Sequence, residues 1–333
     1  MKKTHLASGL LAIAGLAIGA ASISADIKTQ EKTSFQMGGV LGGLINRFAG
    51  DAAKDGVVSS VAVHGNRKMT SNDATGRIVD LAEEKVYDID YKRKEYKVTT
   101  FAELRKKWQD AQDKAKKDVD DMKAEDKADM QQQGKQYEIS FDVKQTGQTK
   151  SIAGHNTHEA IVTITVHEKG KTVEDGGGLV MTNDMWIAPK IAEMDEIAAF
   201  DIKYAKAIYG DVMPNIDAAQ MSMLLASYPA FKEMSAKMAA EAKKLEGTPL
   251  AVMMTLEAVK SAEQMKVSSS ASAGGSASPV GGLAGRLAAR MGPKPKPGEQ
   301  KTKAFSSSNE TISISTSVTD SDTAVPAGFK EKK

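Results

Sequence analysis

Three of the five histidines, His155, His158 and His167, lie in one short stretch of the chain, SIAGHNTHEAIVTITVHE. Glu159 and Glu168 directly follow two of them. Imidazole and carboxylate side chains are the residue types of a metal site or an acid–base pair, so this stretch is the first candidate for chemistry. The spacing His-x-x-His-Glu, however, matches neither helical zinc-protease motif.

A strand would hold these histidines apart. β-branched residues dominate from Ala160 to Val166 and predict a strand, in which successive side chains point to opposite faces. His155 and His158 would then face opposite ways, and twelve strand residues would separate His155 from His167 by roughly 40 Å. We therefore predict turn and strand histidines, with Gly154 bending the chain, and no metal or cofactor site. A metal site at a sharper bend near Gly154 remains the alternative, and it predicts stoichiometric uptake of Zn²⁺ or Cu²⁺.

Other catalytic signatures are missing from the sequence. It contains no G-x-S-x-G elbow, no P-loop and no dinucleotide fingerprint, and it has no Cys for a thiol nucleophile, a disulfide or a Cys-ligated zinc. No helix start follows the three glycines of DGGGLV (Asp175–Val180), so we predict a hairpin turn there rather than a phosphate cradle. We expect no catalytic residue, no cofactor, and a protein that is not an enzyme.

The N-terminal residues carry an export pattern. Lys2 and Lys3 precede an apolar run from Leu6 to Ala20, and small residues follow up to Ala25. This arrangement is typical of a secretory signal peptide, and the run is too short and too rich in Gly and Ala to favour a permanent spanning helix. We predict a signal peptide over residues 1–25, cleavage after Ala25, and a periplasmic or secreted protein without a transmembrane segment.

The charge balance disfavours nucleic acid as a partner. Removal of residues 1–25 takes Lys2 and Lys3 from the 45 basic residues and leaves 43 basic and 43 acidic ones. The aromatic content of 5% is low for a surface on which bases would stack. Methionine is frequent, with 17 in all, and it suits either core filling or an adaptable apolar lining.

The periodicity of apolar residues predicts strands first, then helices among further strands. Thr100 and Glu103 form a capping-box pattern at the start of a charged amphipathic helix, and a second periodic helix runs from Ile191 to Tyr209. Strand patterns joined by hairpins favour a mainly antiparallel sheet with segregated helices, which is an α+β fold. We place the domain at 26–266 with a Gly-rich insertion at 37–56, a low-complexity loop at 267–300, and a final strand and tail at 301–333.

Two Gly-rich segments resemble one another. Gly38–Phe48 (GGVLGGLINRF) and Gly281–Met291 (GGLAGRLAARM) are identical at five of eleven aligned positions. They could be apolar flaps that touch lipid or an envelope protein, or two insertions that are alike only in composition.

Four stretches together resemble an uncharacterised family of exported bacterial proteins, related in pattern to the periplasmic lipoprotein carriers and outer-membrane lipoprotein receptors. They are KVYDIDYKRKEYKVTTFAELRKKW, SIAGHNTHEAIVTITV, GLVMTNDMWIAP and VPAGFK. The resemblance implies a strongly curved antiparallel sheet, an incomplete barrel, with helices covering its concave face. In the lipoprotein carriers such a cavity receives acyl chains. The Gly-rich segments and the charged helix depart from that pattern.

From these observations we expect an exported, non-enzymatic binding protein that holds an apolar ligand, such as an acyl chain, a lipid or a lipoprotein segment, between sheet and helices. The alternative is a structural or protein-interaction module of the cell envelope, with the two Gly-rich segments docking a partner. The residues expected to line the ligand site are Tyr137, Ile139, Phe141, Val143, Leu250, Val252, Met254, Leu256, Met234 and Met238.

Overall fold

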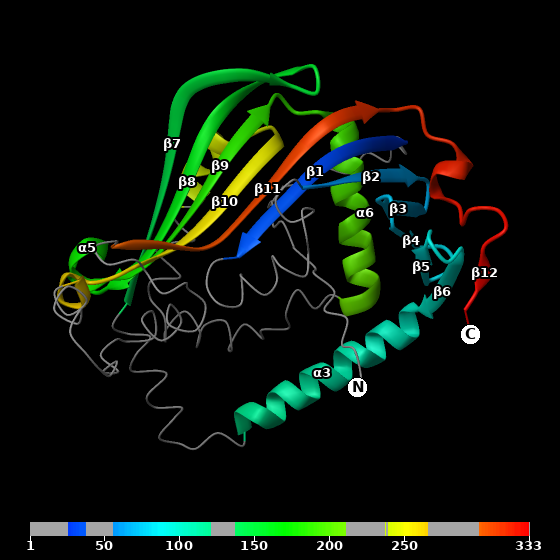
Figure 1. Cartoon of the computed structure of the whole chain (residues 1–333), viewed down its shortest axis with the longest axis horizontal. Coiled ribbons are helices and arrows are strands. Elements are labelled where there is room, and N and C mark those ends of the chain that lie inside the picture. Colours follow the sequence, from blue (N-terminus) through cyan, green and yellow to red (C-terminus); the bar gives the residue numbers. More distant parts are fainter. Residues whose placement is uncertain are drawn as a thin grey trace.

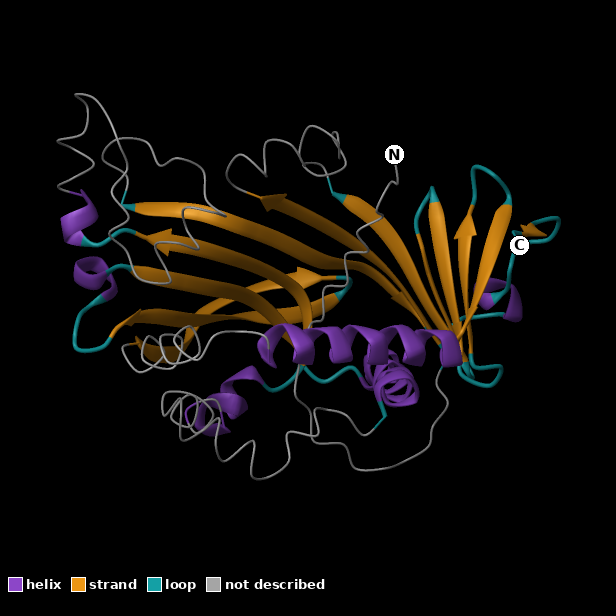
Figure 2. Ribbon diagram, turned by 90° about the horizontal axis from the view of Figure 1, so that it is seen from below, coloured by secondary structure: helices purple, strands orange, loops and turns teal. Residues whose placement is uncertain are grey.

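The computed structural model describes residues 26–37, 56–120, 137–210, 237, 239–265 and 300–332. Twelve strands form one open sheet in the order β12-β6-β5-β4-β3-β2-β1-β11-β10-β9-β8-β7. Every neighbouring pair is antiparallel except β12 and β6. The sheet arches over the helices α3 and α6, which lie on its concave side (Figures 1 and 2). The predicted α+β class with a mainly antiparallel, incompletely closed sheet is therefore confirmed.

Short strands build one half of the sheet and long strands the other. The short half contains β2 (Val57–His64), β3 (Arg67–Ser71), β4 (Thr75–Asp80), β5 (Lys85–Asp90), β6 (Glu95–Thr100) and β12 (Lys330–Glu331). The long half contains β7 (Tyr137–Ile152), β8 (His155–Glu168), β9 (Gly178–Ala188), β10 (Thr248–Val259) and β11 (Lys301–Ser315). β1 (Ile27–Met37) joins the halves by pairing with β2 on one side and β11 on the other.

A two-residue turn connects β7 to β8. Ala153 has φ 50° and Gly154 has φ 81°, so both turn residues are left-handed, as a type I′ hairpin requires. Glycine adopts such a conformation without strain, which explains the predicted bend at Gly154. The DGGGLV segment runs from the end of the single-turn helix α5 (Val173–Gly176), which lies in the connection between β8 and β9, into the first residues of β9.

The helix α3 (Phe101–Asp120) begins at the predicted capping box. The Thr100 hydroxyl accepts a hydrogen bond from the backbone N–H of Glu103 at 3.2 Å, and the Glu103 carboxylate accepts one from the backbone N–H of Thr100 at 2.8 Å. Phe101 is fully buried, whereas Trp108 is 41% exposed and meets Tyr209 edge to face at 4.9 Å. The helix is therefore anchored by its first turns.

The helix α6 (Ala192–Tyr209) contributes two buried residues to the core on the concave face. Its Phe200 and Ile208 pack with Ile27 of β1, Val63 of β2 and Phe101. These residues tie the helices to the concave face where β1 crosses the middle of the sheet. Among the helices within the described ranges, none has the length and apolar character needed to cross a membrane.

A C-terminal segment, defined as residues 316–329, covers the convex face of the short strands. It includes the 3-10 helix η2 (Asp320–Thr323), and its Val318, Val325 and Phe329 pack on a cluster around Met69 and Ile78. A second 3-10 helix, η1 (Ala242–Leu245), precedes β10. The predicted signal peptide at 1–25, most of the predicted insertion at 37–56 and most of the predicted low-complexity loop at 267–300 lie outside the described residues.

Candidate functional site

One row of apolar side chains crosses six neighbouring strands. Strand register places six residues opposite one another in succession: Met37, Phe305, Leu256, Met181, Ile164 and Phe141, from β1, β11, β10, β9, β8 and β7 respectively. We call this set the apolar row. Directly opposed residues in an antiparallel sheet point to the same face, so the six side chains share one face.

That face is the concave one. Met37 and Ile27 are ten positions apart in β1, and the register shift between β1 and β11 places its extra residue, Ile312, in β11. Alternation along β1 is therefore unbroken, and the two side chains point the same way. Ile27 packs against Phe200 and Ile208 of α6. The apolar row therefore lies on the same side of the sheet as α6, towards the end of β1 that is remote from this helix (Figure 1).

Flanking rows extend the apolar surface. Ile139, Val166, Leu179 and Ala258 oppose one another on one side of the apolar row. On the other side lie Val143, Val162, Asn183 and Met254, in which Asn183 is the single polar member. The concave surface of β7 to β10 is thus mainly apolar on both sides of the row, whereas β11 contributes the polar residues Thr302 and Ser307 to the flanking rows.

The opposite face of the same strands is polar. Its matching row consists of Asp142, Thr163, Thr182, Thr255, Ser306 and Gln36. A sheet with one apolar and one polar face normally packs its apolar face against something. All six members of the apolar row keep partial solvent exposure, in contrast to Ile27, which is fully buried under α6.

The structure brings several of the expected ligand-lining residues together. Phe141 and Leu256 belong to the apolar row, Ile139 lies in one flanking row, and Val143 and Met254 share the other. Val252 lies one step further along, opposite Met185.

Two expected lining residues, Leu250 and Tyr137, lie outside these rows. Leu250 sits at a bulge between Pro249 and Ala251 and is packed with Ile152 and Ala188, only 1% exposed. Tyr137 opposes Glu168 at the end of β7. Met234 and Met238 lie outside the described residues.

Sequence reasoning missed four members of the apolar row: Met37, Phe305, Met181 and Ile164. Period-two alternation in IVTITV would have revealed Ile164, since threonine flanks it on both sides. The other three carry no such signal, because Met181 follows Val180, Met37 ends β1 next to two glycines, and Phe305 is followed by three serines.

The histidines do not converge. His155 opposes Ile152 beside the turn, and His158 opposes Ile187 on the other face of the strand. His167 opposes Glu138 near the far end of β8. Within the described ranges, no group of three or more His, Asp or Glu side chains is placed to hold a metal ion.

Charged groups gather on the convex face instead. The Thr146 hydroxyl donates to the Glu159 carboxylate at 2.5 Å, and Glu159 is 7% exposed. Burial raises the pKa of the Asp184 carboxyl above its ordinary value, and the negative charge of Glu159 raises this pKa further. The ammonium group of Lys150 lies 4.0 Å from the centre of the Trp186 ring. The carboxylates of Glu159 and Asp184 and the ammonium group of Lys150 therefore lie on the opposite face of the sheet from the apolar row.

Two pockets among the described residues lie away from the apolar row. One, of about 530 Å³, is at the β7–β8 turn and the start of α6, lined by His155 and Lys190 among others. The other, of about 340 Å³, is on the convex face beneath the C-terminal segment. Neither of these two pockets includes a member of the apolar row.

No protein-family model and no curated protein sequence matches this chain.

Proposed function

We propose that this protein is an exported, non-enzymatic binding protein that holds an apolar ligand, such as an acyl chain, a lipid or a lipoprotein segment, on its concave face. The observation that carries the proposal is the apolar row, in which six strands each contribute one apolar, partly exposed side chain to one face. Scattered exposed apolar residues are ordinary, but a contiguous apolar surface marks a binding site.

The dimensions of the row suit an acyl chain. Neighbouring strands lie about 4.8 Å apart, so five intervals span about 24 Å. One leaflet of a bilayer core is about 15 Å thick, so an extended acyl chain fits along the row with length to spare. Covering about 200 Å² of apolar surface would contribute about 5 kcal/mol at the usual coefficient, and this binding needs no covalent chemistry.

A charge placed in the row tests the proposal. Ile164→Asp puts a carboxylate at the middle of the row, whereas Thr163→Asp puts the same charge on the polar face of the same strand. We expect Ile164→Asp to weaken binding of cis-parinaric acid at least about tenfold, since an unpaired carboxylate resists desolvation, and Thr163→Asp to leave it unchanged. Binding would be measured by fluorescence titration of the full mature chain.

Folding is checked by far-UV circular dichroism, and Ile164→Thr provides a milder change if Ile164→Asp loses structure. Equal affinity of the wild-type protein, Ile164→Asp and Ile164→Thr for the fatty acid would contradict the proposal. So would a loss of binding in Thr163→Asp as large as that in Ile164→Asp.

A further inference from the structure

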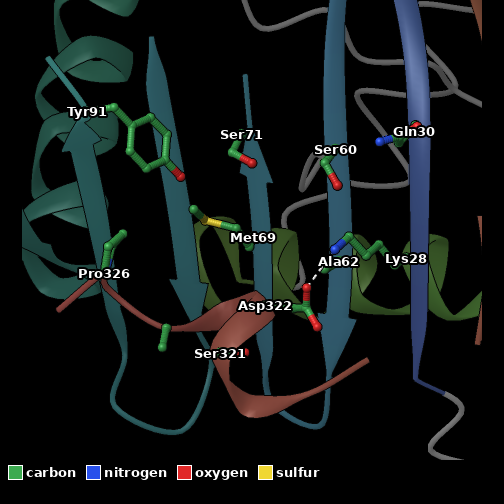
Figure 3. A pocket seen from close by; sticks show the side chains of 11 residues that line it. Lys28, Gln30, Ser60, Ala62, Met69, Ser71, Tyr91, Ser321, Asp322 and Pro326 are labelled. Carbon is green, nitrogen blue, oxygen red and sulfur yellow. Dashed lines mark hydrogen bonds and ion pairs between the residues drawn. The ribbon is translucent and has the colours of Figure 1, made fainter. Parts of the chain in front are cut away.

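A pocket of about 340 Å³ lies on the opposite, convex face of the sheet, between the strands β1–β3 and the C-terminal segment (Figure 3). Its floor is made of Gln30, Ser60 and Ser71, which oppose one another in direct register on three neighbouring strands. We call it the convex pocket. The next residue across is Gly76 in β4, which has no side chain to fill the space.

The ring of Tyr91 lies beside Gly76, in the space that a side chain at this position would occupy. A Cβ atom at Gly76 would lie 2.9 Å from the Tyr91 hydroxyl oxygen and 2.8 Å from the terminal methyl carbon of Met69. Glycine therefore allows the Tyr91 ring to lie against the sheet, and the ring forms one side of the pocket. Phe329 of the C-terminal segment supports this ring edge to face, with centroids 6.0 Å apart.

The opposite wall is held in place by charged contacts. The Lys28 ammonium donates to the Asp322 carboxylate at 2.6 Å, and the backbone N–H of Thr319 donates to the same carboxylate at 2.9 Å. The Nε2 atom of His64 lies 3.0 Å from a carboxylate oxygen of Asp320. These contacts fix η2 over the strands, so the pocket is formed without a ligand and binding would need little ordering of the chain.

The polar groups that line the pocket carry no net charge. Lys28 and Asp322 neutralise one another. Within the described part of the chain, the hydroxyls of Ser60, Ser71 and Tyr91 have no side-chain hydrogen-bond partner. Met69 and Pro326 add apolar contact area beside these hydroxyls. The pocket thus offers separate hydrogen-bond groups around a small apolar patch and one aromatic ring.

We propose that the convex pocket binds a neutral saccharide. A sugar ring presents hydroxyl groups around its rim and C–H groups on its faces, which match the serine hydroxyls, the Gln30 amide and the Tyr91 ring. An ion would find no unpaired charge, and an acyl chain would leave the polar floor unsatisfied. A peptide strand would need a free sheet edge, but β1, β2 and β3 are each paired on both sides. This proposal is independent of the apolar ligand, because the two sites lie on opposite faces.

The methyl group of Met69 reports directly on this pocket. The mature protein would be labelled with ¹³C-methyl methionine, the Met69 signal assigned with Met69→Leu, and maltose and N,N′-diacetylchitobiose titrated in by NMR. We expect at least one of these disaccharides to shift the Met69 signal saturably. Ser60→Ala combined with Ser71→Ala should weaken this binding about tenfold, since two hydrogen bonds between neutral groups are lost.

The matched control is Ser59→Ala, which removes a hydroxyl from the concave face of the same strand and should leave the affinity unchanged. The proposal is overturned if neither disaccharide shifts the Met69 signal, or if the double variant binds as tightly as the wild-type protein. A saturable shift produced by the dipeptide Ala-Ala but by neither sugar would identify a peptide site and also overturn it. Fatty-acid binding would be measured on the same sample, so failure here is distinguishable from failure at the apolar row.

Discussion

The ion pair between Lys28 and Asp322 should make stability depend on pH in a defined window. The hydrogen bond from Lys28, followed by those from Thr319, lowers the pKa of Asp322 from its ordinary value of 3.8 to about 2. A carboxyl group with a depressed pKa in the folded state favours folding when it is ionised. This contribution is complete above about pH 5 and is lost as the pH falls towards 2.

The magnitude follows from the shift and from solvent exposure. One pKa unit corresponds to about 1.4 kcal/mol, so the full shift would correspond to about 2.4 kcal/mol. The Lys28 side chain is 38% exposed, so water and salt screen the pair and we expect about 1 kcal/mol. Asp322→Asn keeps an oxygen for the Thr319 N–H and removes only the charge. It should therefore lower the free energy of unfolding by about 1 kcal/mol at pH 7, about half of that at pH 3, and about a sixth of that at pH 2.

Urea unfolding at these three pH values measures the difference. Combining Asp322→Asn with Lys28→Met in a double-mutant cycle isolates the pair itself. Asp73→Asn, at an exposed position, controls for the change in net charge. A difference that stays constant from pH 7 to pH 2, or a coupling energy of zero at pH 7, would refute the assignment of this stability to the ion pair.

Three further changes probe the fold. Phe101→Ala should cost about 3–5 kcal/mol in urea unfolding, because the ring is fully buried 5.4 Å from the Tyr204 ring, and a cost below 1 kcal/mol would contradict its role in the core. Gly178→Ala should destabilise by about 1–3 kcal/mol, since a Cβ atom would lie 2.1 Å from the Val166 carbonyl oxygen, and an unchanged melting temperature would exclude this clash. Ala153→Asn should raise stability by about 0.5–1 kcal/mol, because Asn tolerates the left-handed turn better than Ala, and a lower melting temperature would speak against a type I′ turn.

Short sequence patterns predicted the features of the fold that depend only on residues close together in the chain. The capping box needs only Thr100 and Glu103, and the β7–β8 turn needs only a residue such as Gly154 that adopts positive φ. The pairing of β1 with β11 was beyond this reasoning, because Lys28 and Ser315 meet only through the tertiary fold. Neither strand has a residue pattern that predicts pairing with the other.

The candidate site was predictable to the same limited extent. Alternation of apolar and polar residues in ISFDV gives Ile139, Phe141 and Val143 a common face, but it cannot place Phe141 in one row with Leu256, which depends on the registers of β8 and β9. The bulge beside Leu250 breaks the alternation within β10, and Leu250 lies in a buried cluster with Ala188, which alternation does not reveal. The sequence did not predict the convex pocket, because its floor consists of polar residues such as Ser60, which form no periodic apolar pattern.

The central position of β1 has a consequence for the order of folding. β2 to β6 pair with near neighbours in the sequence, as do β7 and β8, so these hairpins can form as soon as they are synthesised. The junction of the two halves needs β11, which is the last long strand to leave the ribosome. A chain lacking residues 301–333 would have two separate groups of strands with an unpaired edge on β1 and another on β10. The concave surface therefore becomes continuous only after β11 has been synthesised, although the hairpins on either side can form earlier.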